Sequence, residues 1–216
     1  MKTCLIITGG RLDPAFAGSF CRRNSFDRVI AVDGGLDRAS SLGIIPDMAV
    51  GDFDTVSRPV LEKYRKIPYI IWEVHEPEKN ETDTELAIRK AIACGCTQIT
   101  ILGATGGRFD HMLANVFLLY RCLQQGVKAC ILDRQNKIFL IEESHTFLAS
   151  RLWGKYISFL PLLGQLKGIT LEGFKYPLKD YDLDAASSRC ISNELSGEKG
   201  RITFREGVAI CVESRD

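Results

Sequence analysis

The first two-thirds of the chain alternates short apolar runs with helical patterns, and this alternation restricts the fold more than any other feature. The apolar runs are mostly rich in Ile and Val, and several end in Gly or Asp; they cover residues 3–10, 28–35, 47–52, 69–74, 98–104 and 128–133. Between them, residues 82–95 and 110–126 have the clearest helical spacing. Such alternation predicts a parallel sheet covered by helices on both faces.

After about residue 135 the pattern changes to short strand-like runs separated by Gly, Pro, Asn or Ser, without a long helical pattern between them. The runs cover residues 137–144, 155–162, 168–173, 201–207 and 208–213. This spacing is typical of a β-sandwich or a small barrel. We therefore expect an α/β parallel-sheet domain over residues 1–140 and an all-β sandwich domain over residues 141–216, with the change of pattern near 135–150.

The composition of the 216-residue chain excludes several classes of partner. Lys plus Arg number 28 and Asp plus Glu 27, a net charge of +1, so we expect no nucleic-acid and no membrane partner. The first apolar run is too short for a signal peptide or a membrane span, so we expect a cytoplasmic protein. The eight cysteines form no C-x-x-C pair, which favours buried free thiols over a zinc site or a disulfide scaffold.

Residues suited to phosphate chemistry collect at the expected strand ends, where open α/β sheets bind their ligands. The stretches are "TGG" (8–10), "DGG" (33–35), "GDFD" (51–54) and "GATGGRFDH" (103–111), and "TDTE" (82–85) opens a helix. Glycines let backbone N–H groups approach phosphate oxygens, and aspartates coordinate Mg²⁺. Each stretch alone has an ordinary explanation as a turn or a helix cap. Their convergence on one sheet edge predicts a nucleotide–Mg²⁺ site.

Asp52 and Asp54 follow the apolar run "MAV" two positions apart. If the strand continues through them, both carboxylates point to the same face and repel each other unless a cation lies between them. The stretch "DFDTV" also fits a haloacid-dehalogenase-type phosphatase, in which the first Asp is a nucleophile. That alternative requires a later Lys and a further acidic pair, and it leaves "DGG" and "GATGGRFDH" without a role.

Two side chains within the last glycine stretch add to the expected site. Arg108 is suited to bidentate phosphate contacts. His111, at a helix start, is expected to be structural or a neighbour of the phosphate. His75 and His145 have the setting of ordinary surface residues.

Taken in order, "DGG", "PD…GDFDT", "TDTELA", "GATGGRFDH…N" and the later "SNE" (192–194) closely resemble the thiamine pyrophosphokinase family. The resemblance spans nearly the whole chain and is strongest over residues 33–115. It implies transfer of a pyrophosphoryl group from ATP to the hydroxyethyl arm of thiamine with Mg²⁺, giving thiamine diphosphate and AMP. It also implies an α/β nucleotide domain, a β-sandwich domain and a homodimer whose active site is shared between subunits.

The resemblance assigns roles to individual residues. The metal-binding and catalytic acids correspond to Asp52, Asp54 and Asp83. The nucleotide-binding positions correspond to Asp33, Gly34, Gly103, Gly106, Gly107, Arg108 and Asp110. The thiamine-contacting positions correspond to Ser192 and Asn193.

The chain departs from the family pattern at three places. Thr55 replaces the usual Ser but keeps a hydroxyl, and Asn80 stands where an acidic residue is usual. No Trp follows the Ser-Asn pair, so the ring-stacking candidates are Trp153, Phe174 and Tyr176, each of which is also suited to core packing. Two alternatives remain open: a pyrophosphokinase for another alcohol such as a pterin, and a non-catalytic nucleotide sensor, which would have little use for so many acids.

Overall fold

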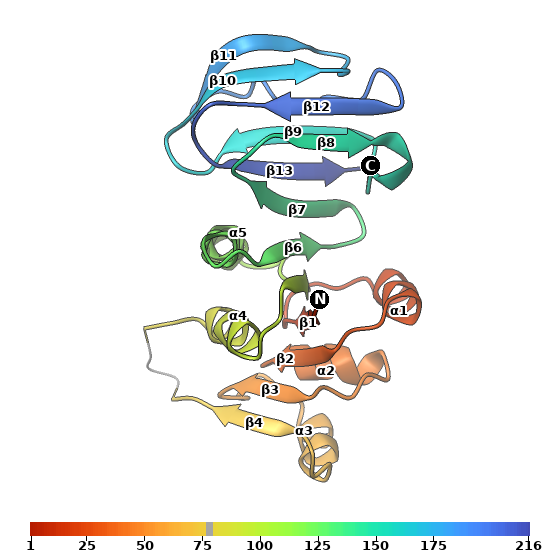
Figure 1. Cartoon of the computed structure of the whole chain (residues 1–216). Helices are drawn as coiled ribbons and strands as arrows, with labels where there is room; N and C mark the ends of the chain where they lie inside the picture. The colour runs from red at the N-terminus through yellow and green to blue at the C-terminus, as the bar shows by residue number, and fades with distance from the viewer. Residues whose placement is uncertain (77–79) are drawn as a thin grey trace. The chain divides into compact units, whose positions relative to one another are not determined.

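The computed structural model describes residues 1–76 and 80–216, which form two compact units, Met1–Arg134 and Gln135–Asp216 (Figure 1). Each unit has a hydrophobic core of its own. The change in sequence pattern near residue 135 therefore coincides with a division in the structure.

The first unit is built on six parallel strands in the order β4-β3-β2-β1-β5-β6. The strands are β1 (Thr3–Ile7), β2 (Arg28–Val32), β3 (Met48–Gly51), β4 (Ile71–Val74), β5 (Gln98–Leu102) and β6 (Lys128–Leu132). All six lie within or largely within the predicted runs, and the parallel pairing is the predicted one. The central β1 is buried from Cys4 to Ile7, as expected of a strand that is covered on both faces.

Five helices join these strands. They are α1 (Pro14–Arg23), α2 (Gly35–Ser41), α3 (Arg58–Arg65), α4 (Asp83–Ala93) and α5 (Phe109–Gln124). Helices α4 and α5 lie on one side of the sheet, and α1, α2 and α3 lie on the other (Figure 1). The predicted capping residue is correct for α4, because the Thr82 hydroxyl accepts from the backbone N–H of Glu85 at 3.2 Å.

The second unit consists of two antiparallel groups of strands. One has the order β7-β13-β9 and the other β11-β10-β12-β8. The strands are β7 (Asn136–Ile141), β8 (His145–Leu148), β9 (Tyr156–Pro161), β10 (Gln165–Glu172), β11 (Leu178–Asp184), β12 (Lys199–Thr203) and β13 (Ala209–Ser214). Side chains from both groups share one core, including Phe147, Phe159 and Leu183. Strands β8 and β11 were not among the predicted runs.

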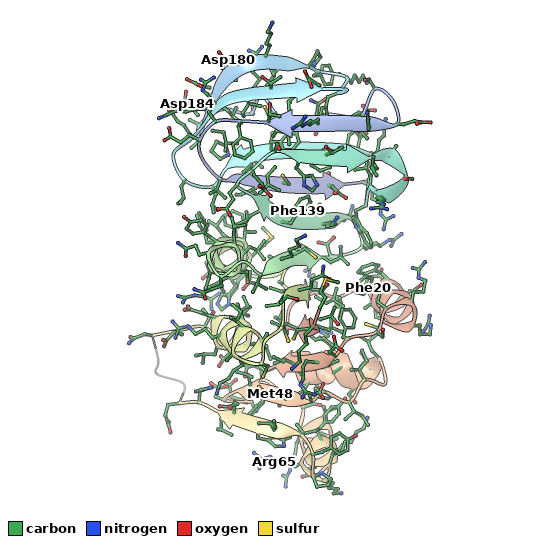
Figure 2. All side chains as sticks on the ribbon, viewed as in Figure 1. Phe20, Met48, Arg65, Phe139, Asp180 and Asp184 are labelled. Atoms are coloured by element: carbon green, nitrogen blue, oxygen red, sulfur yellow. The ribbon has the colours of Figure 1, made fainter. Side chains whose placement is uncertain are left out.

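Strand β11 lies at the edge of its sheet and carries a row of acidic side chains. Asp180, Asp182 and Asp184 are exposed, whereas Leu183 between them is buried. Figure 2 shows Asp180 and Asp184 on this outer strand. Charged side chains on an edge strand oppose pairing with another chain, which explains why β11 lacks the apolar run that identifies a strand in the sequence.

Within the described residues, the cysteines have the state that the sequence favours. All eight cysteines are free, and Cys4, Cys96, Cys122, Cys190 and Cys211 are buried. No helix among residues 1–76 and 80–216 is long and apolar enough to cross a lipid bilayer.

Candidate active site

The first unit contains a cavity of about 720 Å³ at the carboxyl edge of its parallel sheet. Four segments form most of its wall: the loops after β1, β2 and β5, and the start of α4. Of the predicted site residues, those that line it are Asp33, Gly34, Asp83, Gly103, Gly107 and Arg108. The cavity therefore brings together the "DGG", "TDTE" and "GATGGR" stretches.

Strand register explains why these loops meet. Ile7 at the end of β1 pairs with Ala31 in β2 and with Leu102 at the end of β5. The strand order reverses between β1 and β5, the point at which open α/β sheets form a ligand crevice. A Cβ atom at Gly10 would collide with the carbonyl oxygen of Gly103. Glycine at position 10 therefore allows the two loops to touch.

Asp33 is held in a strained conformation at the end of β2. Its φ is 46°, in the left-handed region that few residues other than glycine adopt. Its backbone N–H donates to the carbonyl of Val50 at 3.1 Å, and its carboxylate accepts from the N–H of Phe53 at 3.2 Å. A Cβ at Gly51 would occupy the position of this carboxylate. The Asp33 side chain of "DGG" therefore packs directly against the backbone of the "GDFD" segment.

The Asp33 carboxyl group lies among other acids. Its pKa is raised from 3.8 to about 7, mainly by burial and also by the charge and hydrogen bond of Asp83 and the charge of Asp52, against the opposing effect of the Phe53 N–H. Ionised carboxylates this close repel each other unless a proton or a cation neutralises them. The three acids therefore form a local concentration of negative charge at the cavity.

The predicted geometry of Asp52 and Asp54 is wrong in one respect. Strand β3 ends at Gly51, and Phe53 has a φ of 64°, so the alternation of a strand does not extend through Asp54. Instead the Asp52 carboxylate accepts from the backbone N–H of Asp54 at 3.1 Å. Asp54 is exposed, and neither acid lines the cavity, although Asp52 is close enough to affect Asp33.

A divalent cation fits this donor set if the substrate supplies some of its ligands. Within residues 1–76 and 80–216, no three His, Cys, Asp or Glu side chains form a ready metal-binding group. Asp33 and Asp83 nevertheless make direct contact, with Asp52 nearby. Mg²⁺ is usually bound by one or two carboxylates together with phosphate oxygens and water rather than by a cage of protein ligands. The acids present suit that mode of binding.

Arg108, the predicted phosphate ligand, is already paired. Its Nε and Nη2 donate to the Asp110 carboxylate at 3.1 and 2.6 Å. This guanidinium and the backbone N–H of His111 lower the pKa of Asp110 from 3.8 to about 2. Asp110 lies in the first turn of α5, after Arg108 at the N-cap position, and does not line the cavity.

The glycine loop itself is fixed from both sides. The Asn115 amide donates to the carbonyl of Ala104 at 3.2 Å, and the Gly106 carbonyl accepts from the N–H of Arg11 at 3.2 Å. Asn115 lines the cavity and Gly106 does not. The final Asn of the motif "GATGGRFDH…N" thus positions the loop.

Further residues line or adjoin the site, and of these Arg38 had no assigned role from the sequence. Arg38 and Thr8 line the cavity, and His111 does too, as a phosphate neighbour would. His75 is half-buried rather than fully exposed, and its backbone N–H donates to the carbonyl of Gly51 at 3.1 Å. The spacing of "DGGLDR" could have identified Arg38, because it lies one helical turn after Gly34.

The predicted thiamine-contacting pair lies in the second unit. Ser192 lines a separate cavity of about 530 Å³ with Tyr156, Arg215 and Asp216 among its neighbours. Ser192 has a φ of 55°, and its backbone N–H donates to the hydroxyl of Ser158 at 2.9 Å. Of the two predicted residues, Ser192 is therefore the one that lines a cavity.

Asn193 is buried and its amide binds the backbone. It accepts from the N–H groups of Tyr176 and Glu194 at 3.1 and 2.9 Å and donates to the carbonyl of Tyr176 at 2.8 Å. Of the ring-stacking candidates, Phe174 is a core residue with 4% of its surface exposed, whereas Tyr176 is 58% exposed. Asn193 therefore fixes the strand segment that presents Tyr176.

Comparison with known proteins identifies the same family over both units. The thiamin pyrophosphokinase catalytic domain matches residues 23–131, and the thiamin pyrophosphokinase vitamin B1 binding domain matches residues 142–209. Thiamine pyrophosphokinase of Bacillus subtilis is 35% identical over 218 residues, covering 100% of both chains.

Solved structures agree with the sequence matches. The crystal structure of thiamine pyrophosphokinase from Bacillus subtilis superposes with a TM-score of 0.88 at 34% identity, covering 100% of both chains. The enzyme from Geobacillus thermodenitrificans gives a TM-score of 0.85 at 30% identity, covering 99% of this chain and 98% of that one. By its sequence over the whole length and by its fold, this chain belongs to the thiamin pyrophosphokinase family.

Proposed function

We propose that this protein transfers a pyrophosphoryl group from ATP to the hydroxyethyl group of thiamine, giving thiamine diphosphate and AMP. The observation that carries the proposal is the cavity of the first unit, which is lined both by the acids Asp33 and Asp83 and by Gly103 and Gly107 of the glycine-rich loop. Acids together with a glycine-rich backbone suit a nucleotide whose phosphates arrive with a metal ion.

In this reaction the thiamine hydroxyl oxygen forms a bond to the β-phosphorus of ATP. The bond between that phosphorus and the oxygen bridging to the α-phosphorus breaks, and AMP leaves with the bonding electron pair. The hydroxyl proton passes to a carboxylate. We assign this role to Asp83 rather than Asp54, because Asp83 lines the cavity and Asp54 does not.

The proposed metal is Mg²⁺, with Asp52, Asp54 and Asp83 as its protein ligands and Asp33 beside them. When bound, it neutralises phosphate charge and orients the β-phosphorus. Among the residues of this chain, Asp33 keeps Asp83 and the "GDFD" loop together through its contacts with Asp83 and the N–H of Phe53. Backbone N–H groups of the glycine loop hold the phosphates, and the Arg108 guanidinium joins them when a phosphate replaces Asp110 as its partner.

We further propose that the Ser192 cavity of the second unit receives thiamine, and that Tyr176, an exposed aromatic residue whose backbone is hydrogen-bonded to Asn193, contributes a ring. Phosphate-binding residues and the Ser192 cavity belong to different units. A homodimer in which one subunit supplies the acids and the other supplies Ser192 would join them. We place the enzyme in the cytoplasm, in keeping with its eight free cysteines.

Product identification tests the proposal. Purified protein incubated with MgATP and thiamine should form AMP and thiamine diphosphate in equal amounts. Asp52→Asn and Asp83→Asn should each lower kcat by about 10²-fold or more, because they remove charge from the reacting centre, while the thermal unfolding temperature stays near that of the wild type. Glu62→Gln, on the exposed face of α3, is the matched control and should keep full activity.

Three results would contradict the proposal. Accumulation of ADP would indicate attack at the γ-phosphorus, and release of free phosphate without an acceptor would indicate the phosphatase alternative. Turnover with a pterin alcohol but not with thiamine would reassign the acceptor. The family domains and the relatives described above are all thiamine pyrophosphokinases, so the phosphatase alternative has no support from them.

A further inference from the structure

We propose that Arg38 of α2, a residue to which the sequence motifs assign no role, binds the phosphates of the nucleotide, and that it is the first guanidinium available to them. The inference rests on the proposed function, since it concerns the same cavity. Arg38 is exposed and lines the cavity together with Gly34 and Asp83.

The partners of the charged side chains around the cavity support this assignment. Arg108 lines the cavity too, but its guanidinium is bound in a two-point ion pair by Asp110. Asp37 accepts from the backbone N–H and the hydroxyl of Ser57. Arg38 has no side-chain hydrogen bond or ion pair within residues 1–76 and 80–216. Its five N–H donors are therefore open to a ligand.

Charge explains why the site needs such a group. The nucleotide triphosphate is a polyanion, and the acids Asp33 and Asp83 on the cavity wall would repel it. A metal ion offsets part of this repulsion at the acids. Arg38 lies on α2, the helix that begins at the last glycine of "DGG". It can neutralise phosphate oxygens that are not bound to the metal ion. The fork of a guanidinium matches two phosphate oxygens, as an ammonium does not.

Other ligands fit Arg38 less well. Thiamine carries a positive charge and would be repelled. Stacking of the guanidinium on the adenine ring is the alternative that shares the same nucleotide. It differs in a measurable way, because a stacking residue recognises adenosine and a phosphate-binding residue does not.

The test compares wild type, Arg38→Gln and Arg38→Lys by isothermal titration calorimetry with MgATP, inorganic triphosphate and adenosine. We expect Arg38→Gln to weaken MgATP and triphosphate binding by roughly 10- to 100-fold, the factor that hydrogen bonds to charged groups represent. The affinity of Arg38→Lys for both ligands should lie between those of the wild type and Arg38→Gln, because lysine keeps the positive charge and lacks the paired N–H donors of the guanidinium. Adenosine affinity and the KM for thiamine should stay unchanged.

Arg23→Gln is the matched control, because Arg23 is an exposed arginine near the end of helix α1 that does not line the cavity. It should bind like the wild type, and thermal unfolding should confirm that all variants are folded. Unchanged MgATP affinity in Arg38→Gln, or an equal loss for adenosine, would overturn the proposal. Failure of the wild type to form AMP and thiamine diphosphate would instead reject the proposed function, so the two outcomes are separable.

Discussion

Single residues in this protein are constrained by neighbours far away in the sequence. Asp33 adopts a left-handed backbone conformation that costs energy, and the N–H of Phe53 and the open face of Gly51 accommodate its carboxylate. Strain of this kind persists only where several contacts fix it. At Asp33 those contacts come from the same "GDFD" loop that carries Asp52, so the strained residue and the acid loop depend on each other.

Glu194 provides a pH-dependent test at the residue scale. Hydrogen bonds from Lys175 at 3.1 Å and Lys155 at 3.2 Å lower the pKa of its carboxyl group below 4.5. A lowered pKa adds stability that is present above pH 4.5 and is lost as the pH falls through the folded-state value. Glu194→Gln should therefore be less stable than the wild type at pH 7, and the difference should disappear in acid.

Thermal unfolding of both proteins from pH 8 to pH 3 measures this difference. The control is Glu198→Gln, because Glu198 is exposed and has no ion pair within the described parts of the chain. That variant should follow the wild type at every pH. A stability difference for Glu194→Gln that persists unchanged at pH 3 would show that the two lysines do not act through its charge.

At the scale of elements, the helix start at α4 both caps a helix and positions an acid. Thr82 is the N-cap, and Asp83 is the first residue of the helix and lines the cavity. A cap fixes the direction in which the first turn leaves the loop. The capping hydrogen bond should therefore matter for the position of the Asp83 carboxylate as well as for the stability of α4.

We expect Thr82→Ala to lower the free energy of unfolding by about 1 kcal/mol, because it leaves the N–H of Glu85 without its cap. We also expect kcat to fall under conditions where the protein remains fully folded. Thr82→Ser keeps the hydroxyl and should restore both quantities. Urea unfolding and steady-state kinetics provide the measurements, and a loss of stability with unchanged kcat would show that the cap does not position Asp83.

At the scale of the whole molecule, the two cavities belong to different units of the chain. The cavity with the acids is formed by residues before Arg134, and the Ser192 cavity by residues after it. The predicted division into domains at residues 1–140 and 141–216 stays a prediction about functional domains. Whether one subunit or two complete a site can be decided by mixing inactive variants.

One variant is Asp54→Asn, and the other is Ser192→Arg, which places a long charged side chain in the Ser192 cavity. If the proposed dimer shares its sites, each mixed dimer has one intact site of two. With random reassortment half of the dimers are mixed, so roughly a quarter of wild-type activity should return. Absence of recovery after subunit exchange has been verified by mass spectrometry would reject the shared site.

The sequence by itself determined the class of the first unit, the location of its strand ends and the family. These features depend on local sequence patterns. Buried parallel strands appear in the sequence as apolar runs, and the loops at their carboxyl ends appear as clusters of glycine and aspartate. The helix start at Thr82 and the stops at Gly95 and Gly126, both with positive φ, were likewise readable from neighbouring residues. Strand β11 could not be predicted from neighbouring residues, because an edge strand with a solvent-exposed face contains few apolar residues.

Only the tertiary structure decided how the side chains of the site are used. The turn at Phe53 separates Asp52 and Asp54 from the strand pattern, and Asp110 engages the guanidinium of Arg108. The amide of Asn193 binds the backbone of Tyr176 rather than facing open space. Such pairings depend on backbone turns and on contacts between distant segments. Residue spacing along the chain does not encode them, because each side chain has several partners within reach until the fold selects one.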